Sequence, residues 1–153
     1  MNRILVDIDY KYEDNDRMVK MVSDFAFKMY FVTDVLGVRF TGIKVYETNK
    51  GVHIYLDYES ERPLTPLEII IIQLVLGSDY KRELYNLRRA RAWLDGEELD
   101  SNWNTLFRYK YRNGKLVSHE TVTEFSRFFE EYVMNRYNNL LKGEEHEDSL
   151  QRL

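Results

Sequence analysis

Hydrophobic and polar residues alternate along residues 3–10 of the chain, RILVDIDY. A period of two predicts a strand with one buried face, and Asp7 and Asp9 fall on its other face. Over residues 17–36 the apolar positions change to helical spacing, and Gly37 then supplies a helix-ending residue. The chain therefore begins with a half-buried strand followed by an amphipathic helix.

Two β-rich runs, residues 41–48 and 51–58, are joined by a short turn and predict a hairpin. In the second run the apolar residues share one side of the strand. His53, Tyr55 and Asp57 share the other side. The hairpin thus presents a second polar strand face.

Capping signals mark the helices that follow. Thr65-Pro66-Leu67-Glu68 has the pattern of a helix start, and Ser78 is a candidate cap for a further helix that runs to about residue 94. Asn113-Gly114 predicts the turn of a second hairpin, formed by residues 106–112 and 115–119. A second capping pattern, from Thr121 to Glu124, predicts a last helix that ends near residue 143.

The predicted order, βαββα(ββ)α, indicates an α+β fold with ferredoxin-like or RRM-like elements. We expect an antiparallel sheet of about five strands, with helices mainly on one face and the other face open. In this topology the first and third strands are neighbours in the centre of the sheet. We expect one domain over residues 1–142 and an acidic, frayed tail over residues 143–153.

Composition narrows the possible chemistry. The 153 residues include no cysteine, which excludes disulfides, thiolate catalysis and cysteine-based zinc sites. A net charge of −4 predicts no general affinity for nucleic acid. The N-terminus has no signal-peptide pattern, and the longest apolar stretch is shorter than the ~20 residues that span a bilayer. We therefore expect a cytoplasmic protein that is neither secreted nor membrane-bound.

The predicted open face is the first candidate site. Two carboxylates two residues apart on a strand project the same way and can hold a divalent cation, for which Mg or Mn suits best. A nearby histidine can bind phosphate, transfer a proton or complete the metal shell. The alternative is a solvated strand face, since half-buried strands alternate polar residues outward by default. The face comprises Asp7, Asp9, Lys44, Tyr46, His53, Tyr55 and Asp57.

The second candidate is the basic segment of residues 77–93, GSDYKRELYNLRRARAW, which contains Glu83. Its cations and interleaved aromatic residues could grip phosphates and stack on bases. The alternative is an exposed helix in which Glu83 makes ordinary i±4 pairs. The cations are Lys81, Arg82, Arg88, Arg89 and Arg91.

Two short motifs resemble those of archaeo-eukaryotic primases. Residues 4–9 (ILVDID) and 51–55 (GVHIY) are similar to the hhhDhD and sxH motifs, in the same order. The resemblance implies that Asp7 and Asp9 hold metal and that His53 binds the nucleotide phosphate. The chain departs from the pattern because the usual serine before the histidine is absent.

A longer stretch resembles a family of small proteins encoded by rod-shaped and filamentous viruses of thermophilic archaea. The similar segments are GVHIYL and LGSDYKRELYNLRRARAW. The family includes a DNA nuclease with an unusual α+β fold in which a glutamate is implicated. The resemblance implies that Glu83 matches that glutamate and that the protein works in the host-cell cytoplasm.

Together these observations predict a metal-dependent DNA nuclease. Asp7 and Asp9 would hold Mg or Mn, and Glu83 and His53 would be catalytic. Which of the two centres is the active one stays open. The alternatives are a primase-like nucleotidyltransferase fragment and a non-catalytic nucleic-acid-binding or adaptor protein. The residues expected to contact DNA are Lys81, Arg82, Arg88, Arg89, Lys44 and Tyr55.

The last predicted helix is rich in aromatic residues. They could close the core or pair with a second subunit, so a homodimer is a further expectation. They are Phe125, Phe128, Phe129, Tyr132 and Tyr137.

Overall fold

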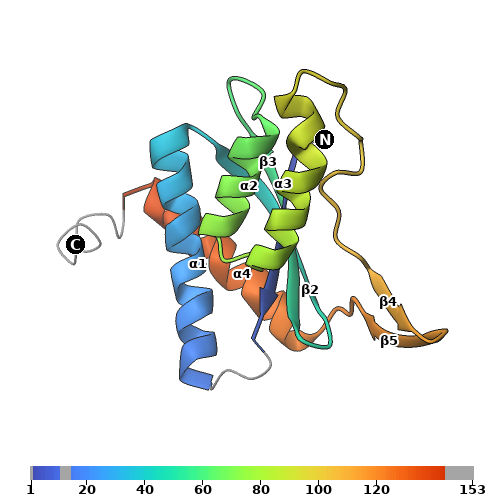
Figure 1. The fold of residues 1–153 in the computed structure, drawn as a ribbon. Coiled ribbons are helices and arrows are strands. Elements are labelled where there is room, and N and C mark those ends of the chain that lie inside the picture. Colours follow the sequence, from blue (N-terminus) through green and yellow to red (C-terminus); the bar gives the residue numbers. More distant parts are fainter. Residues whose placement is uncertain (1, 11–14, 144–153) are drawn as a thin grey trace.

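The computed structural model describes residues 2–10 and 15–143, which form a mixed α+β fold (Figure 1). The predicted strands and helices are present, and two helices, separated at Gly77 and Ser78, stand where the predicted order has one. The elements are β1 (Arg3–Asp9), α1 (Asn15–Leu36), β2 (Arg39–Glu47), β3 (Gly51–Glu59), α2 (Pro66–Val75), α3 (Tyr80–Leu94), β4 (Tyr109–Arg112), β5 (Lys115–His119) and α4 (Glu124–Leu141).

The main sheet has three antiparallel strands in the order β1-β3-β2. The first and third strands are neighbours, as predicted, and Asp7 lies directly opposite His53. The predicted five-stranded sheet is wrong, because β4 and β5 form a separate two-stranded hairpin. The predicted central position of β1 is also wrong, since β1 is an edge strand.

Three side chains and one backbone N–H from the α2–α3 region occupy the outer edge of β1, where a fourth strand would otherwise pair. In an antiparallel ladder alternate residues turn their N–H and C=O away from the partner strand. In β1 these residues are Leu5 and Asp7. Their N–H groups donate to Gln73 Oε1 (3.0 Å) and Ser78 Oγ (3.1 Å), and their carbonyls accept from Arg82 Nη1 (3.2 Å) and Asp79 N (2.7 Å).

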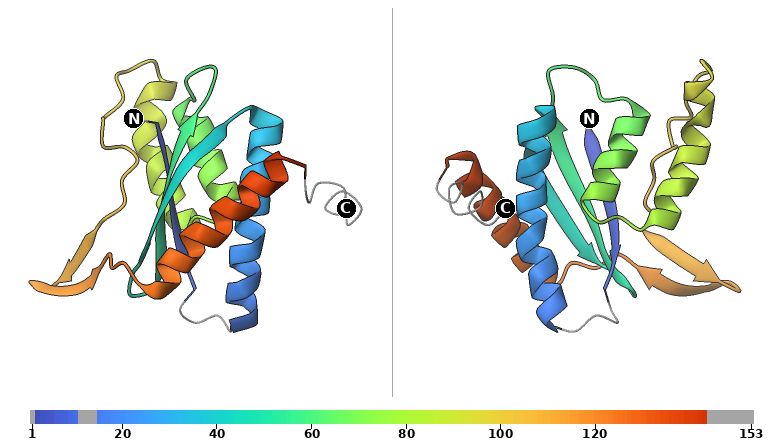
Figure 2. Two further views of the ribbon diagram at one scale, coloured as in Figure 1. Left: turned by 180° about the vertical axis from the view of Figure 1, so that it is seen from behind. Right: turned by 60° about the vertical axis from the view of Figure 1, so that its left-hand side comes forward.

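Helices α1 and α4 cover one face of the sheet (Figure 2), and the alternation of β1 explains why. Ile4, Val6 and Ile8 point into this layer and are buried. They join the apolar side of β3, the inner face of α1, and Phe129 and Tyr137 of α4 in one core. Burial of these large apolar surfaces is the main stabilising contribution to the fold.

Two aromatic residues of α4 do not enter the core. Phe128 and Tyr132 are exposed on its outer side, with their rings 5.6 Å apart. A second subunit would pack on these exposed rings, and the expected homodimer stays a prediction.

The capping residues differ in part from the predicted ones. Thr65 caps α2 with the predicted capping box. Asp79 rather than Ser78 caps α3, because the Ser78 hydroxyl is used elsewhere. Thr123 rather than Thr121 caps α4, because the backbone of Thr121 pairs with β2 at Glu47.

The second face of the sheet, predicted to be open, is partly covered. The chain between α3 and α4 crosses it, and the Glu47–Thr121 backbone pairs (2.8 and 2.9 Å) fasten this crossing to the end of β2. Within the described ranges, no helix is long and apolar enough to cross a membrane. Of the predicted acidic tail, residues 144–153 lie outside the described part of the chain.

Candidate active site on the sheet face

Asp7 and His53 lie side by side on the second face of the sheet. The antiparallel register places them opposite each other, and His53 Nε2 lies 3.6 Å from Asp7 Oδ1. The Asp7 side chain is 25% exposed, so its carboxylate lies at the boundary between protein and solvent. Tyr46 is paired with His53 from β2, and Lys44 is paired with Tyr55. The predicted shared face is therefore present around His53.

Glu120 is a site residue that sequence patterns did not identify. Its Oε1 lies 2.9 Å from His53 Nδ1 and accepts a hydrogen bond from the hydroxyl of Tyr55. The Glu120 N–H donates to the carbonyl of Arg108 (3.0 Å), and the next residue forms the bridge to β2. Only this tertiary crossing brings Glu120 to the sheet, so no local motif marks it. We call Asp7, His53, Tyr55 and Glu120 the face site.

The electrostatics of the face site fix the histidine tautomer. Burial would raise the pKa of Glu120, but hydrogen bonds from His53 and Tyr55 outweigh it and lower the pKa. Burial and the same hydrogen bond raise the pKa of Tyr55, so its hydroxyl keeps its proton. Because Glu120 is an ionised acceptor, the neutral ring of His53 carries its proton on Nδ1. Nε2, which faces Asp7, is then the basic nitrogen.

Asp7 sits in a less favourable environment for charge. Burial raises its pKa, His53 partly opposes this, and the neighbouring Asp9 raises it further. A positive charge bound near both carboxylates would relieve this cost. The donor set suits Mg or Mn, which bind carboxylates and usually retain waters or substrate phosphates as further ligands.

The predicted acidic residues do not form a complete metal cage. Asp9 is exposed at the end of β1, and Asp57 pairs with Arg3 (3.1 Å). In the part of the chain that is described, no three His, Asp or Glu side chains converge as a metal site. A cation here would thus need ligands from substrate or water.

Glu83 lies in a different environment, sealed inside the protein at 1% exposure. Its Oε1 accepts from Gln73 Nε2 (2.7 Å) and Asn86 Nδ2 (3.0 Å). Its Oε2 accepts from Ser78 Oγ (2.7 Å) and Arg82 Nη1 (2.5 Å). An ionised carboxylate has about four acceptor positions, so these four donors saturate it.

The groups around Glu83 form one continuous hydrogen-bonded network. Asn104 closes it, since its Oδ1 accepts from Gln73, Arg82 and Asn86 at 2.9–3.2 Å. We call Gln73, Ser78, Arg82, Glu83, Asn86 and Asn104 the Glu83 network. Through the edge contacts of β1 it holds the backbone of Leu5 and Asp7. The two predicted centres are therefore joined through one strand.

The predicted DNA-binding cations are divided by this arrangement. The Arg82 guanidinium belongs to the Glu83 network, and burial lowers its pKa. Lys81, Arg88 and Arg89 are exposed on α3. Lys44 lies on the β2 side of the sheet, 3.7 Å from Glu130 of α4. Exposed cations on α3 thus remain available to phosphates, whereas Arg82 is occupied.

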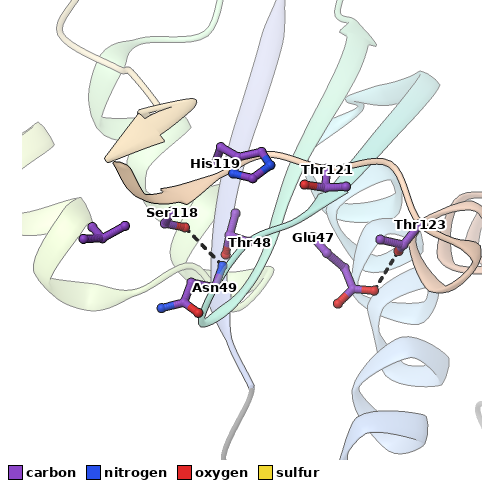
Figure 3. Close-up of a pocket in the computed structure, with 8 residues that line it drawn as sticks. Glu47, Thr48, Asn49, Ser118, His119, Thr121 and Thr123 are labelled. Atoms are coloured by element: carbon purple, nitrogen blue, oxygen red, sulfur yellow. Dashed lines mark hydrogen bonds between the residues drawn. The ribbon is translucent and has the colours of Figure 1, made fainter. Parts of the chain in front are cut away.

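A pocket of about 340 Å³ lies between the β2–β3 turn and β5 (Figure 3), and its lining includes His119 and Thr121, the chain neighbours of Glu120. Thr48 and Asn49 line it from the turn, and Ser118 and His119 line it from β5. The N–H of Asn49 donates to the Ser118 hydroxyl (3.1 Å) across it. The pocket therefore marks where the second hairpin joins the body.

No family model, no curated protein and no solved structure matches this chain. The resemblances to primase motifs and to the viral family remain predictions. The geometry of the two polar centres is therefore what indicates a function.

Proposed function

We propose that this protein hydrolyses phosphodiester bonds of DNA at the face site. One observation carries the proposal: Glu120 holds His53 through Nδ1 at 2.9 Å and turns Nε2 toward the carboxylate of Asp7. A carboxylate that orients a histidine leaves the opposite nitrogen free to accept a proton. The ring is also packed firmly in place, since the His53 side chain is only 10% exposed.

In this proposal each side chain of the face site has a separate task. His53 Nε2 accepts the proton of an attacking water, and Glu120 stabilises the imidazolium that results. The water oxygen bonds to phosphorus as the P–O bond to the leaving oxygen breaks, and that oxygen takes a proton from solvent. Tyr55 fixes Glu120 through its hydroxyl. Asp7 and Asp9 would repel a phosphodiester, so they act by holding Mg or Mn. The cation, when bound, supplies charge neutralisation at the phosphoryl group and a more acidic water.

Glu83 is assigned a positioning task. All four of its acceptor positions are taken, so in this arrangement it does not reach a substrate. Its network instead holds the β1 edge on which Asp7 lies. Loss of Glu83 would weaken activity through β1, and the exposed cations Lys81, Arg88 and Arg89 would help to hold the DNA.

A primase-like nucleotidyltransferase is the second candidate. The observation that favours it is the pairing of Asp7 with His53 on adjacent strands, which brings the two primase-like motifs together. Such an enzyme would use the same face and the same cation. It would differ in its product, because nucleotides would be joined into a growing strand, with release of pyrophosphate, rather than DNA being cut.

The proposal is tested with end-labelled linear DNA, single- and double-stranded, incubated with Mg, with Mn and with EDTA. Cleavage that needs the metal and is lost in both His53→Ala and Asp7→Asn supports it. The matched control is Asp57→Asn, an acid on the same face that pairs with Arg3, which should cut normally. Incorporation of dNTPs without cutting would favour the second candidate, and binding without turnover would leave an adaptor.

A further inference from the structure

The second hairpin stands apart from the rest of the molecule. Figures 1 and 2 show that β4 and β5 project from the body at the foot of the sheet. All of β4 and nearly all of β5 are exposed. We call residues 107–119, which contain both strands, the arm. A two-stranded hairpin gains little stability by itself, so its exposed side chains need another explanation.

The arm has a composition unlike that of the whole chain. Its sequence, FRYKYRNGKLVSH, contains four basic residues and no acid, in a chain of net charge −4. The arm alone therefore carries a formal charge of +4, and the remainder carries −8. The cations are Arg108, Lys110, Arg112 and Lys115.

Aromatic residues alternate with these cations. Phe107, Tyr109 and Tyr111 are 71%, 61% and 63% exposed. Strand geometry sends alternate residues to opposite faces, so Tyr109 and Tyr111 share one face of the arm and Lys110 and Arg112 share the other. The register of the hairpin shifts by one residue between Lys110 and Tyr111. The extra residue, Val117, is on β5, so β4 keeps its own alternation.

This pattern suits one class of ligand. Exposed aromatic rings spaced at about 6.6 Å along a strand offer successive stacking surfaces, and the cations offer partners for phosphates. Bases can stack on protein rings only when they are unpaired, which a duplex permits only at its ends. We propose that the arm binds single-stranded nucleic acid, with Tyr109 and Tyr111 stacking on bases. The long side chains of Lys110 and Arg112 would reach the backbone of the same strand around the edge of β4.

The arm is tied to the face site by its two ends. Near the start of the arm, the carbonyl of Arg108 accepts a hydrogen bond from the N–H of Glu120. At the other end, Glu120 directly follows His119, the last residue of the arm. Asn49 and Ser118 hold its base to the β2–β3 turn (Figure 3). A strand bound along the arm would thus lead to His53. This substrate form deepens the proposed function and rests on it.

Binding is measured separately from cutting. A fluorescein-labelled 20-nucleotide single strand and the matching duplex are titrated with the full chain in EDTA and followed by anisotropy. The variants are Tyr109→Ser/Tyr111→Ser and Lys110→Gln/Arg112→Gln. The matched control is Lys20→Gln/Lys28→Gln, which removes two exposed cations from α1. Circular dichroism and the melting temperature verify that each variant is folded, which we expect because the arm lies outside the core.

The wild type should bind the single strand more tightly than the duplex. The tyrosine variant should lose at least ~10-fold in affinity for it, as expected from the loss of two stacking residues. The lysine–arginine variant should reduce the slope of log affinity against log salt by about 1.4. The α1 control should keep more of its affinity than either arm variant.

Two outcomes would overturn the proposal: single-strand binding that is unchanged in the tyrosine variant, or tighter binding to the duplex. The two proposals fail separately. If the arm binds single strands but the protein does not cut DNA with any metal, the arm proposal stands and the nuclease proposal is wrong. Cutting at the wild-type rate by both arm variants, together with unchanged single-strand binding in the tyrosine variant, leaves the nuclease and removes the arm.

Discussion

The face site and the Glu83 network are both rich in polar side chains, yet they differ in how their hydrogen-bonding groups are used. Around Glu83 every carboxylate acceptor position is filled by a protein donor, and the side chain is 1% exposed. Around His53, Glu120 takes Nδ1, and Nε2 has the partly exposed Asp7 as its neighbour at 3.6 Å. We therefore place the proposed reaction on the sheet face.

This difference shows why charge alone does not locate a site. A buried ion pair such as Glu83–Arg82 gains little net stability over apolar residues, but removing one partner is costly. Such a pair is best placed to hold a strand edge in one position. An oriented histidine beside a partly exposed carboxylate is instead able to exchange protons or bind a cation.

The largest expected effect is on stability, from Glu83→Ala. It leaves the Arg82 guanidinium buried without its carboxylate, so the free energy of unfolding should fall by about 3–5 kcal/mol. Urea denaturation followed by circular dichroism measures this. The control, Glu98→Ala in the exposed loop after α3, should change stability by less than ~0.5 kcal/mol. Equal small changes in both would contradict the role given to the network.

The next largest effect is on catalysis, from His53→Gln. Removal of a general base should lower the single-turnover rate of DNA cleavage by about 10²–10⁴-fold. The variant should remain folded, since glutamine keeps a donor for Glu120. Cleavage that persists at more than a tenth of the wild-type rate would remove His53 from the chemistry.

Ser78→Ala tests the link between the two centres. The hydroxyl donates to Glu83 (2.7 Å) and accepts from the N–H of Asp7 (3.1 Å), so its loss should cost about 1–3 kcal/mol. In a double-mutant cycle, its effect on stability should be coupled to that of Glu83→Gln by more than ~0.5 kcal/mol. Additive effects would mean that Ser78 does not act through the network.

The smallest effect is the pH dependence of Glu120→Gln. The folded state lowers the pKa of Glu120 from its usual 4.5, so its charged form contributes stability above that pH. This contribution should be lost as the pH falls below 4.5 through the folded-state pKa. We expect a difference of about 1–2 kcal/mol between wild type and variant at pH 6 that shrinks by pH 3. An equal difference at both pH values would show that the Glu120 charge does not hold the site.

Strand periodicity predicted much of the face site. The alternation in residues 3–10 and 51–58 placed Asp7 and His53 on one face, and the structure pairs them directly. It could not predict Glu120, because its approach depends on a backbone bridge between Thr121 and Glu47.

The same limits explain the errors in the sheet. The five-strand prediction failed because side chains from the α2–α3 region, among them Gln73 and Arg82, replace a strand at the edge of β1. Helical periodicity also marks Glu83 as a polar position without showing that polar partners surround it. The pattern of hydrophobic and polar residues indicates which face a residue lies on, but it does not indicate what covers that face.

The most direct test of the central claim compares Glu83→Gln with His53→Gln in cleavage rate per folded molecule. Both substitutions replace a titratable group with an amide, and the folded fraction is measured for each under the assay conditions. The account predicts that folded Glu83→Gln cuts DNA within ~10-fold of the wild-type rate, whereas folded His53→Gln loses at least ~100-fold. The reverse result, an inactive but folded Glu83→Gln beside an active His53→Gln, would place the chemistry at Glu83 and contradict the account.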